Sequence, residues 1–361
     1  MELLPVLGKI PSGQRLERIK LSPHFADGKF QNEMPTGLLR GGASFFKVLW
    51  QFMNKPKNTV PPAVLPSVRT DLRHLPDGAP VVVWFGHSSY LIKAGGKTIL
   101  VDPVFSGHAS PVPFFARAFR GANVYGVNDL PEIDMVIITH DHYDHLDYAV
   151  IKQLATKARH FFTSLGVGAH LEFWGIGVER ITELDWGEEV AVEGGMLTAT
   201  TARHFSGRGM GNGLTLWSSF VLKTGGYSFF LGGDSGYGPH FKAIGEQFGP
   251  FDIAILECGQ YGKYWPDIHM LPEETVAAAG DLGAKLLLPV HWGKFTLSLH
   301  PWDEPVRRAV AAAKKAGLAM ATPMIGEPVI LGGNVPQRMW WEDVQATSKV
   351  LQPASLTIET K

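Results

Sequence analysis

The sequence has almost no cysteine, no long apolar run and no excess of charge of either sign, and each absence excludes a class of protein. Cys258 is the only cysteine among 361 residues, so no intrachain disulfide can form and we expect a reducing compartment. No uninterrupted apolar stretch reaches the roughly 18 residues that a membrane-spanning helix needs. The first twenty residues also lack an apolar core of signal-peptide length. We therefore expect a cytoplasmic protein, and peripheral contact with a membrane surface stays open.

The balance of charges limits the partners. The chain has 33 Lys and Arg residues against 34 Asp and Glu residues, which gives a formal net charge of -1. The protein as a whole then has no field that would attract a polyanion, so we predict no nucleic-acid partner. Hydrophobic residues make up 45% of the chain, which is ample for a packed core.

The chain is expected to form one main domain between two flanking segments. Residues 1–78 are interpreted as an N-terminal extension that ends in a proline-rich arm, and residues 336–361 as a C-terminal tail. Apolar runs typical of strands occur at residues 81–85, 90–93, 98–101, 135–139, 197–203, 219–222, 227–231, 252–256 and 285–290, and helical patterns at residues 147–158, 241–248, 272–282 and 304–316. Hairpins come first and strands later alternate with helices, which predicts a layered α/β (α+β) architecture with mixed sheets.

A dense polar run begins where the expected strand at residues 135–139 ends. Its sequence is His140-Asp141-His142-Tyr143-Asp144-His145. His140 and His142 are spaced by two, so in extended backbone they can point the same way and converge on one metal ion. Asp144 and His145 can face a second ion. Four candidate ligands within six residues are a specific signal for a metal centre.

The same arrangement recurs later in the chain. His204, Asp234 and His291 each follow an apolar run with strand character. Strand ends are rigid, and the loops beyond them leave a coordination position open, which is typical of a catalytic site.

These residues are assigned to two metal ions. The expected ligands are His140, His142 and His204 for the first metal, and Asp144, His145 and His291 for the second. Asp234 should bridge them, because a carboxylate has two oxygens and can span ions about 3.5 to 4 Å apart. With no cysteine near the ligands, we expect two Zn²⁺ ions, and Mn²⁺ or iron as alternatives.

Four other polar residues keep more than one interpretation. His87 follows a strand, and we favour a structural or ligand-supporting role for it over direct ligation. Asp141 is either a supporting acid or a turn residue, and Asp147 is equally open. His269 lies just ahead of the helix start at Pro272, a position from which it could meet a substrate.

The segment from His140 to Asp147 resembles the signature of metallo-β-lactamase-fold hydrolases. Segments around it resemble one branch, the N-acylphosphatidylethanolamine-hydrolysing phospholipase D family. These segments are Trp84-Phe85-Gly86-His87, Asp102-Pro103-Val104-Phe105-Ser106, Gly233-Asp234-Ser235-Gly236-Tyr237, Phe248-Gly249-Pro250-Phe251-Asp252 and His291-Trp292-Gly293. The likeness covers roughly residues 80–300, and Lys29-Phe30-Gln31-Asn32 extends it weakly toward the N-terminus.

The resemblance implies a fold, a cofactor and a reaction. It implies the αβ/βα four-layer sandwich, with the hydrolase domain at residues 79–335, and two zinc ions held by the seven ligands above. It also implies cleavage of a phosphodiester that releases N-acylethanolamine and phosphatidic acid from N-acylphosphatidylethanolamine-like lipids. Asp144, Asp234 and His269 would carry the chemistry: Asp234 would position the attacking hydroxide, and His269 would orient the phosphate or protonate the leaving alkoxide.

Two departures from the family pattern bear on the substrate. Asp141 stands where the animal lipase has Asn, and the loop at residues 260–265 has no obvious match. Loops of that kind shape the substrate pocket, so the fold and the metals transfer more safely than the lipid.

Several alternatives therefore stay open. The aromatic residues at 45–53 and 113–120 either form a membrane-contacting surface or pack against the core or a second copy in a homodimer. A phospholipid or other phosphodiester is the expected substrate. The alternative functions are a soluble metal-dependent lactonase or phosphodiesterase for a small metabolite, and an inactive metal-binding protein.

Overall fold

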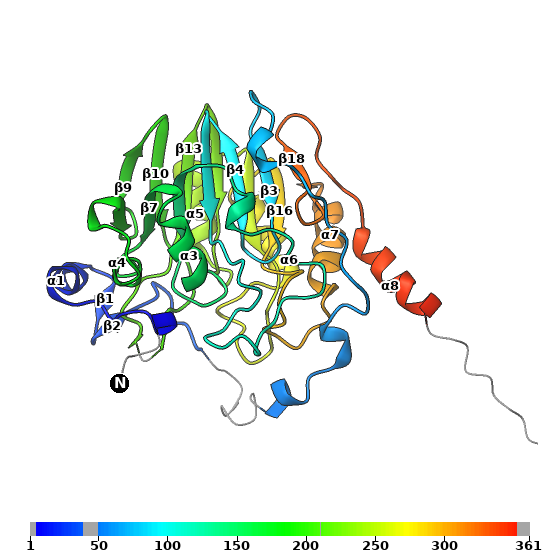
Figure 1. Ribbon diagram of the computed structural model, residues 1–361, viewed down its shortest axis with the longest axis horizontal. Coiled ribbons are helices and arrows are strands. Elements are labelled where there is room, and N and C mark those ends of the chain that lie inside the picture. Colours follow the sequence, from blue (N-terminus) through cyan, green and yellow to red (C-terminus); the bar gives the residue numbers. More distant parts are fainter. Residues whose placement is uncertain (1–4, 39–49, 210, 352–361) are drawn as a thin grey trace, which may run out of the picture.

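Two seven-stranded sheets face each other in the computed structural model, which describes residues 5–38, 50–209 and 211–351 (Figure 1). Helices cover the outer face of each sheet. The result is the four-layer αβ/βα sandwich that the family resemblance implies.

The first sheet has the strand order β18-β3-β4-β5-β6-β7-β8. In that order the strands are Pro328–Ile330, Val81–Trp84, Tyr90–Ala94, Lys97–Val101, Ile133–Ile138, Ala158–Ser164 and Ile181–Leu184. Side chains alternate between its two faces, as they must in pleated strands. Val82 and Ile137 join the core between the sheets, whereas Val81 and Val136 join a separate core under the helices.

The second sheet has the order β17-β16-β15-β14-β13-β10-β9. Its strands are Ala319–Met320, Leu286–Val290, Ile253–Glu257, Tyr227–Leu231, Ser219–Thr224, Gly195–Thr200 and Glu189–Val192. β14, β15, β16 and β17 run parallel to one another, and the remaining pairs are antiparallel. Leu197, Phe220 and Phe229 contribute to the core between the sheets.

Helices complete the outer layers. α3 (Tyr148–Leu154) and α4 (Gly168–Phe173) cover the first sheet, and Ile151 and Leu171 pack in its outer core. α5 (His240–Phe248), α6 (Pro272–Asp281) and α7 (Glu304–Ala316) cover the second sheet. Figure 1 shows the two helical layers on opposite sides of the paired sheets.

Short elements connect these layers. They are the 3-10 helices η1 (Pro5–Leu7), η2 (Lys57–Thr59), η3 (Leu72–His74), η4 (Val127–Asp129) and η5 (Val178–Arg180), and the small hairpin of β11 (Gly207–Arg208) and β12 (Gly211–Asn212).

Two of the expected elements have wrong boundaries. The helix predicted at residues 147–158 ends at Leu154, and β7 begins at Ala158, because Phe161 and Phe162 are buried on the two faces of the first sheet. The strand predicted at residues 197–203 ends at Thr200. Beyond it the backbone N–H of Arg203 donates to the Ser235 hydroxyl instead of a neighbouring strand.

Both flanking segments pack on the sandwich. α1 (Gly13–Leu21) and the hairpin of β1 (Phe25–Ala26) and β2 (Lys29–Phe30) precede the sheets, and Phe30 is buried against Trp217. α8 (Trp340–Leu351) follows them, and the ring of Trp340 stacks on that of Trp292 with 5.3 Å between centroids. The domain boundaries at residues 78 and 336 stay a prediction, but described parts of both segments pack against the core.

The surfaces considered for membrane contact are only partly described. Residues 45–49 lie outside the described residues. Trp50 and Met53 are exposed, and so are Phe114 and Phe115, whereas Phe119 is buried in the core. Within the described part of the chain, no helix is long and apolar enough to cross a membrane.

Candidate metal centre

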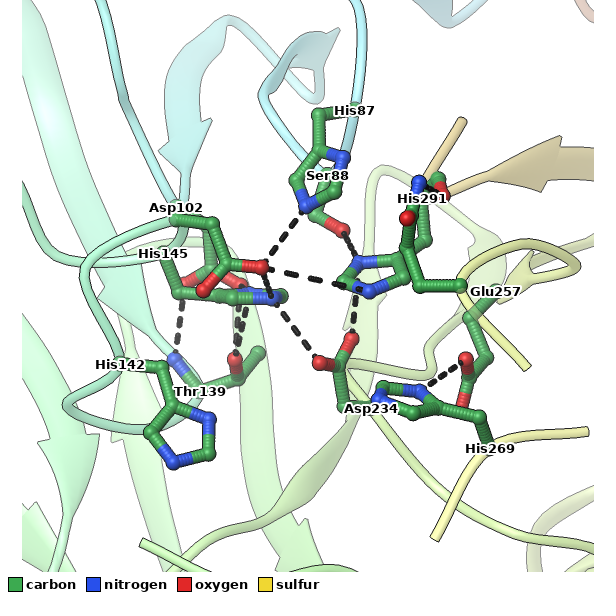
Figure 2. A network of polar contacts seen from close by, with 12 residues as sticks. His87, Ser88, Asp102, Thr139, His142, His145, Asp234, Glu257, His269 and His291 are labelled. Carbon is green, nitrogen blue, oxygen red and sulfur yellow. Dashed lines mark hydrogen bonds and ion pairs between the residues drawn. The ribbon is translucent and has the colours of Figure 1, made fainter. Parts of the chain in front are cut away.

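Polar side chains gather where the central parallel strands of both sheets end. His140 to His145 follow β6, and Asp102 follows β5 directly beside it. In the second sheet Asp234 follows β14 and His291 follows β16. The carboxyl ends of these strands meet at one edge of the sandwich, so residues far apart in the chain converge there (Figure 2).

All seven predicted ligands lie in this cluster. Ligand atoms of His140, His142, His204 and Asp234 all lie within 4.8 Å of one another. His142 is central to this group: its Nδ1 lies 2.9 Å from His140 Nε2 and 3.3 Å from His204 Nε2. Asp234 Oδ2 completes the group, at 3.8 Å from His140 Nε2 and 3.7 Å from His204 Nε2.

A second group meets on the other side of Asp234. It consists of Asp144, His145 and His291, and it also includes His87. His145 Nε2 lies 3.6 Å from Asp144 Oδ2 and 3.1 Å from Asp234 Oδ2. His291 Nε2 lies 4.0 Å from Asp144 Oδ2, and its Nδ1 lies 3.1 Å from Asp234 Oδ1. Figure 2 shows Asp234 between His145 and His291.

The donor set fits a pair of divalent metal ions. The first group offers four nitrogen or oxygen atoms around a common point, as a zinc site requires. The second offers those of Asp144, His145 and His291, with Asp234 beside them. Among the described residues, the buried His145 Nε2 and Asp234 Oδ1 have no hydrogen-bond partner. Buried polar atoms without partners are costly, and a cation between them would satisfy both. Assignment of individual residues as ligands stays a prediction.

Supporting residues fix the tautomer of His145. Its Nδ1–H donates to Asp102 Oδ2 at 2.7 Å, which leaves the Nε2 lone pair facing the cluster. Asp102 is itself held by Thr139, whose backbone N–H donates to Oδ1 at 2.9 Å and whose hydroxyl donates to Oδ2 at 2.7 Å. All three residues are buried. This carboxylate–histidine arrangement is typical of metal-binding imidazoles.

His140 and His204 are oriented in a similar way. His140 Nδ1 lies 3.0 Å from the Thr139 hydroxyl oxygen, and His204 Nδ1 donates to the carbonyl oxygen of Ile268 at 2.8 Å. In both rings the lone pair of Nε2 is then free, and Nε2 points to Asp234. The orientation of the ligands therefore does not depend on the metal alone.

The electrostatics favour a bound cation. Burial lowers the pKa of the His142 imidazole to about 4, and it holds the pKa of His140, His204 and His291 well below the ordinary value. These rings are neutral near pH 7, which is the metal-binding form.

The carboxylates add negative charge. Burial would raise the pKa of Asp144, but His145 and the hydrogen bond from His87 hold it below its ordinary value. Burial raises the pKa of Asp234 to about 6 against the opposing charge of His145. Burial would lower the pKa of His145, yet Asp234, Asp144 and Asp102 together raise it well above the ordinary value. The centre of the cluster thus attracts positive charge.

The residues with open interpretations now have positions. His87 Nε2 donates to Asp144 Oδ2 at 2.8 Å, a contact consistent with the supporting role favoured for His87, which stays a prediction. Asp141 is buried and accepts from the Gly207 backbone N–H, the Thr215 hydroxyl and His170 Nε2, which ties the polar loop to a neighbouring one.

Asp147 also has a structural position. Its Oδ1 accepts from the N–H groups of Ala149 and Val150, which caps α3, and its Oδ2 accepts from those of Phe105 and Ser106. Its capacity to accept hydrogen bonds is taken up by backbone donors, so it is not directed at the metal cluster.

His269 lies at the edge of the cluster. Its ring centroid is 5.0 Å from that of His204 and 5.2 Å from that of His291. Its Nδ1 donates to Glu257 Oε2 at 2.7 Å, and Glu257 is fully buried. The Glu257 carboxylate also accepts the backbone N–H of Ser235, next to Asp234. His269 Nε2 is thereby left to face the site.

Sequence reasoning gave no role to Asp102 or Glu257. Both had the signal that identified the ligands, because each is the first polar residue at the end of a buried strand. The apolar runs were correctly located at residues 98–101 and 252–256, but the polar residue that ends each run was not interpreted.

Comparison with known proteins gives a consistent picture. A model of the beta-lactamase superfamily domain matches residues 97–292. An uncharacterised protein of Mycobacterium tuberculosis is 38% identical over 325 residues, covering 89% of this chain and 87% of that protein. An N-acyl-phosphatidylethanolamine-hydrolyzing phospholipase D of Caenorhabditis elegans is 31% identical over 227 residues, covering 59% of this chain and 64% of that protein.

The fold has counterparts among solved structures. A metallo hydrolase from the hyperthermophilic archaeon Ignicoccus hospitalis superimposes with a TM-score of 0.53 and 19% identity. The match covers 71% of this chain and all of the archaeal one. At this identity the match concerns the fold.

Proposed function

The chain belongs to the beta-lactamase superfamily and is a metal-dependent hydrolase, and from this premise we propose that it is a phosphodiesterase of phospholipase D type. The proposed reaction releases N-acylethanolamine and phosphatidic acid from N-acylphosphatidylethanolamine-like lipids. The observation that carries the proposal is the similarity to the nematode enzyme named for that activity. The arrangement of His269 and Glu257 beside the metal cluster supports it.

The proposal includes two metal ions. His140, His142 and His204 would hold the first, Asp144, His145 and His291 the second, and Asp234 would contact both. Zinc is the expected metal, and manganese or iron suits the same nitrogen and oxygen donors. When bound, such a pair supplies a water whose pKa is lowered toward neutrality and a Lewis acid for the phosphoryl oxygens.

The residues of the chain then have distinct tasks. Asp234 Oδ1, which has no hydrogen-bond partner among the described residues, would orient the attacking water. The water oxygen bonds to phosphorus as the bond between phosphorus and the ethanolamine oxygen breaks. His269 Nε2 has a free lone pair because Nδ1 donates to Glu257, so it would take up a proton released by the attacking water and pass it to that leaving oxygen. Phosphatidic acid and N-acylethanolamine are the products.

Apolar side chains near His269 support a lipid substrate. Ile268 packs in a cluster with Tyr264 and Trp265, against which Phe52 and Phe205 also pack. The ring of Phe205 lies 4.5 Å from that of His142, so the cluster reaches the proposed ligands.

A cavity adjoins this cluster and connects it to exposed apolar surface. The cavity has about 460 Å³ and is lined by Trp50, Tyr264 and Trp265 among others. Trp50 is 64% exposed and Met53 is 78% exposed. Peripheral contact with a membrane through this surface is part of the proposal, because an apolar surface with nearby lysines suits a bilayer interface.

The test compares a lipid with soluble substrates. Purified protein would be given vesicles containing N-acylphosphatidylethanolamine and, in parallel, a panel of lactones and soluble phosphodiesters, with products identified by mass spectrometry. We expect N-acylethanolamine and phosphatidic acid in equal amounts from the wild type and a large loss of both with Asp234→Ala. Cleavage of only the soluble compounds would replace the proposal with a small-metabolite hydrolase. Turnover that is unchanged in Asp234→Ala would contradict the assigned centre.

A further inference from the structure

We propose that Asn32, in the N-terminal segment, is a positioning residue for the metal ligand His204. The N-terminal segment would then be part of the metal centre although it lies 172 residues away in the chain. The inference rests on the proposed metal-binding role of His204 and does not depend on the lipid substrate.

The contact between the two residues is a paired hydrogen bond. The backbone N–H of His204 donates to Asn32 Oδ1 at 3.0 Å, and Asn32 Nδ2 donates to the carbonyl oxygen of His204 at 2.7 Å. The carboxamide of Asn32 therefore satisfies both backbone groups of His204 at once, as a partner strand would do for a residue inside a sheet.

His204 needs such a partner because it is not in a strand. β10 ends at Thr200, so the sheet holds the chain only up to four residues before the ligand. Arg203 is held by its N–H to the Ser235 hydroxyl and by its carbonyl oxygen, which accepts from the Gly236 N–H. At the next residue, His204, the backbone N–H and carbonyl oxygen are both held by the side chain of Asn32 instead.

The segment that carries Asn32 is itself fixed. The backbone N–H of Phe30 donates to the carbonyl oxygen of Gly213, and the Phe30 ring is buried beside Trp217. On the other side of Asn32, the guanidinium of Arg203 donates to the Pro35 carbonyl oxygen and the Thr36 hydroxyl. A rigid support on both sides lets one carboxamide set the position of the ligand backbone.

The ring of His204 is fixed independently. Its Nδ1 donates to the Ile268 carbonyl oxygen, and its Nε2 points to His142 Nδ1 and Asp234 Oδ2. With backbone and ring both held, Nε2 has one position, which the first metal would use. Loss of the Asn32 contact frees the backbone and leaves the ring contact alone. Partners of metal-binding histidines typically contribute roughly 10- to 100-fold to metal affinity.

The experiment measures metal binding directly. Metal-free wild type, Asn32→Ala and Asn32→Asp would be titrated with Zn²⁺ against a chromophoric chelator, and with Co²⁺ to follow the visible spectrum of the bound ion. Asn32→Asp keeps the size of the side chain but turns an oxygen toward the His204 carbonyl. The matched control is Gln31→Ala, because the Gln31 amide donates to Ala26 within the same hairpin, and no hydrogen bond among the described residues joins its side chain to the His204 loop.

We expect both Asn32 variants to weaken one of the two binding steps by roughly 10- to 100-fold, with an altered Co²⁺ spectrum, while the other step stays at the wild-type value. The unfolding midpoint of the metal-free protein should fall by no more than the loss of two hydrogen bonds causes. Gln31→Ala should match the wild type. Two unchanged binding steps would overturn the inference. So would equal weakening of both steps together with a lower midpoint, since that result indicates general damage to the fold. The titration does not measure lipid hydrolysis, so a failure of the proposed lipid substrate would not change the conclusion about Asn32 and metal binding.

Discussion

The most informative single substitution removes the acceptor that holds His145. In Asp102→Asn the side chain keeps its shape, but one of its two oxygens becomes an NH₂ group. Asp102 Oδ1 accepts the Thr139 backbone N–H, and Oδ2 accepts both the Thr139 hydroxyl and His145 Nδ1–H. In either orientation the new NH₂ group meets a donor. If it faces His145, it favours the tautomer with the proton on Nε2.

The size of the effect follows from this geometry. A proton on His145 Nε2 would block the lone pair that faces Asp144 and Asp234 at 3.6 and 3.1 Å. We expect roughly 10- to 100-fold weaker binding at the second metal position, which corresponds to about 1.4 to 2.7 kcal/mol. The first position, with His140, His142 and His204, should change less, because none of those rings hydrogen-bonds to Asp102 directly and only His140 is linked to it, through the Thr139 hydroxyl.

Chelator competition with Zn²⁺ would measure the two binding steps in Asp102→Asn and in a matched control. The control is Asp134→Asn, at the opposite end of the first sheet, where the carboxylate accepts the Thr98 N–H and lies 3.3 Å from Arg159. The control should bind metal like the wild type. If Asp102→Asn also bound two ions with wild-type affinity, the argument from His145 orientation would be refuted.

Three further predictions concern Asp234, Glu257 and Trp341. Zinc affinity should fall about tenfold per pH unit below pH 6. The pKa of Asp234 is raised to about 6, so below that pH a metal ion must displace the proton of the Asp234 carboxyl. Dissociation constants for zinc that stay constant between pH 7 and pH 5 would contradict this. Glu257→Gln should slow hydrolysis roughly tenfold with unchanged metal content, because the substitution weakens the hydrogen bond that holds His269. Tenfold is a fraction of the rate that a positioned acid–base residue contributes. Loss of metal instead would reassign Glu257 as a ligand. Trp341→Ala should lower the free energy of unfolding by about 3 to 5 kcal/mol in denaturant titrations, since the indole is fully buried; a loss below about 1 kcal/mol would mean that α8 is not part of the core.

Much of the fold could be predicted because its central strands are apolar and short. The runs at residues 81–101, 227–231 and 285–290 were found for that reason. β7 was missed because its first residues include Arg159 and His160, which resemble the end of the preceding helix. β9 was missed because it is half-exposed and carries only a weak alternating pattern.

The candidate site, like the fold, could be predicted only in part. The seven residues that the sequence singled out lie together, because each is in a loop that follows a strand at one edge of the sandwich. Their partners were harder to predict. Asp102 and Glu257 follow strands too, but a lone carboxylate at a strand end is common. Asn32 was noted only in the segment that extends the family resemblance, and its contact with His204 could not be inferred, since it joins segments that nothing in the local sequence relates.

Metal analysis of the purified protein tests the central claim most directly. The wild type, loaded with Zn²⁺ and freed of excess by gel filtration, should retain about two ions per chain, and His142→Ala should retain fewer and lose its hydrolytic activity. A wild type that retains no metal, or a His142→Ala variant that retains two ions and full activity, would contradict the account.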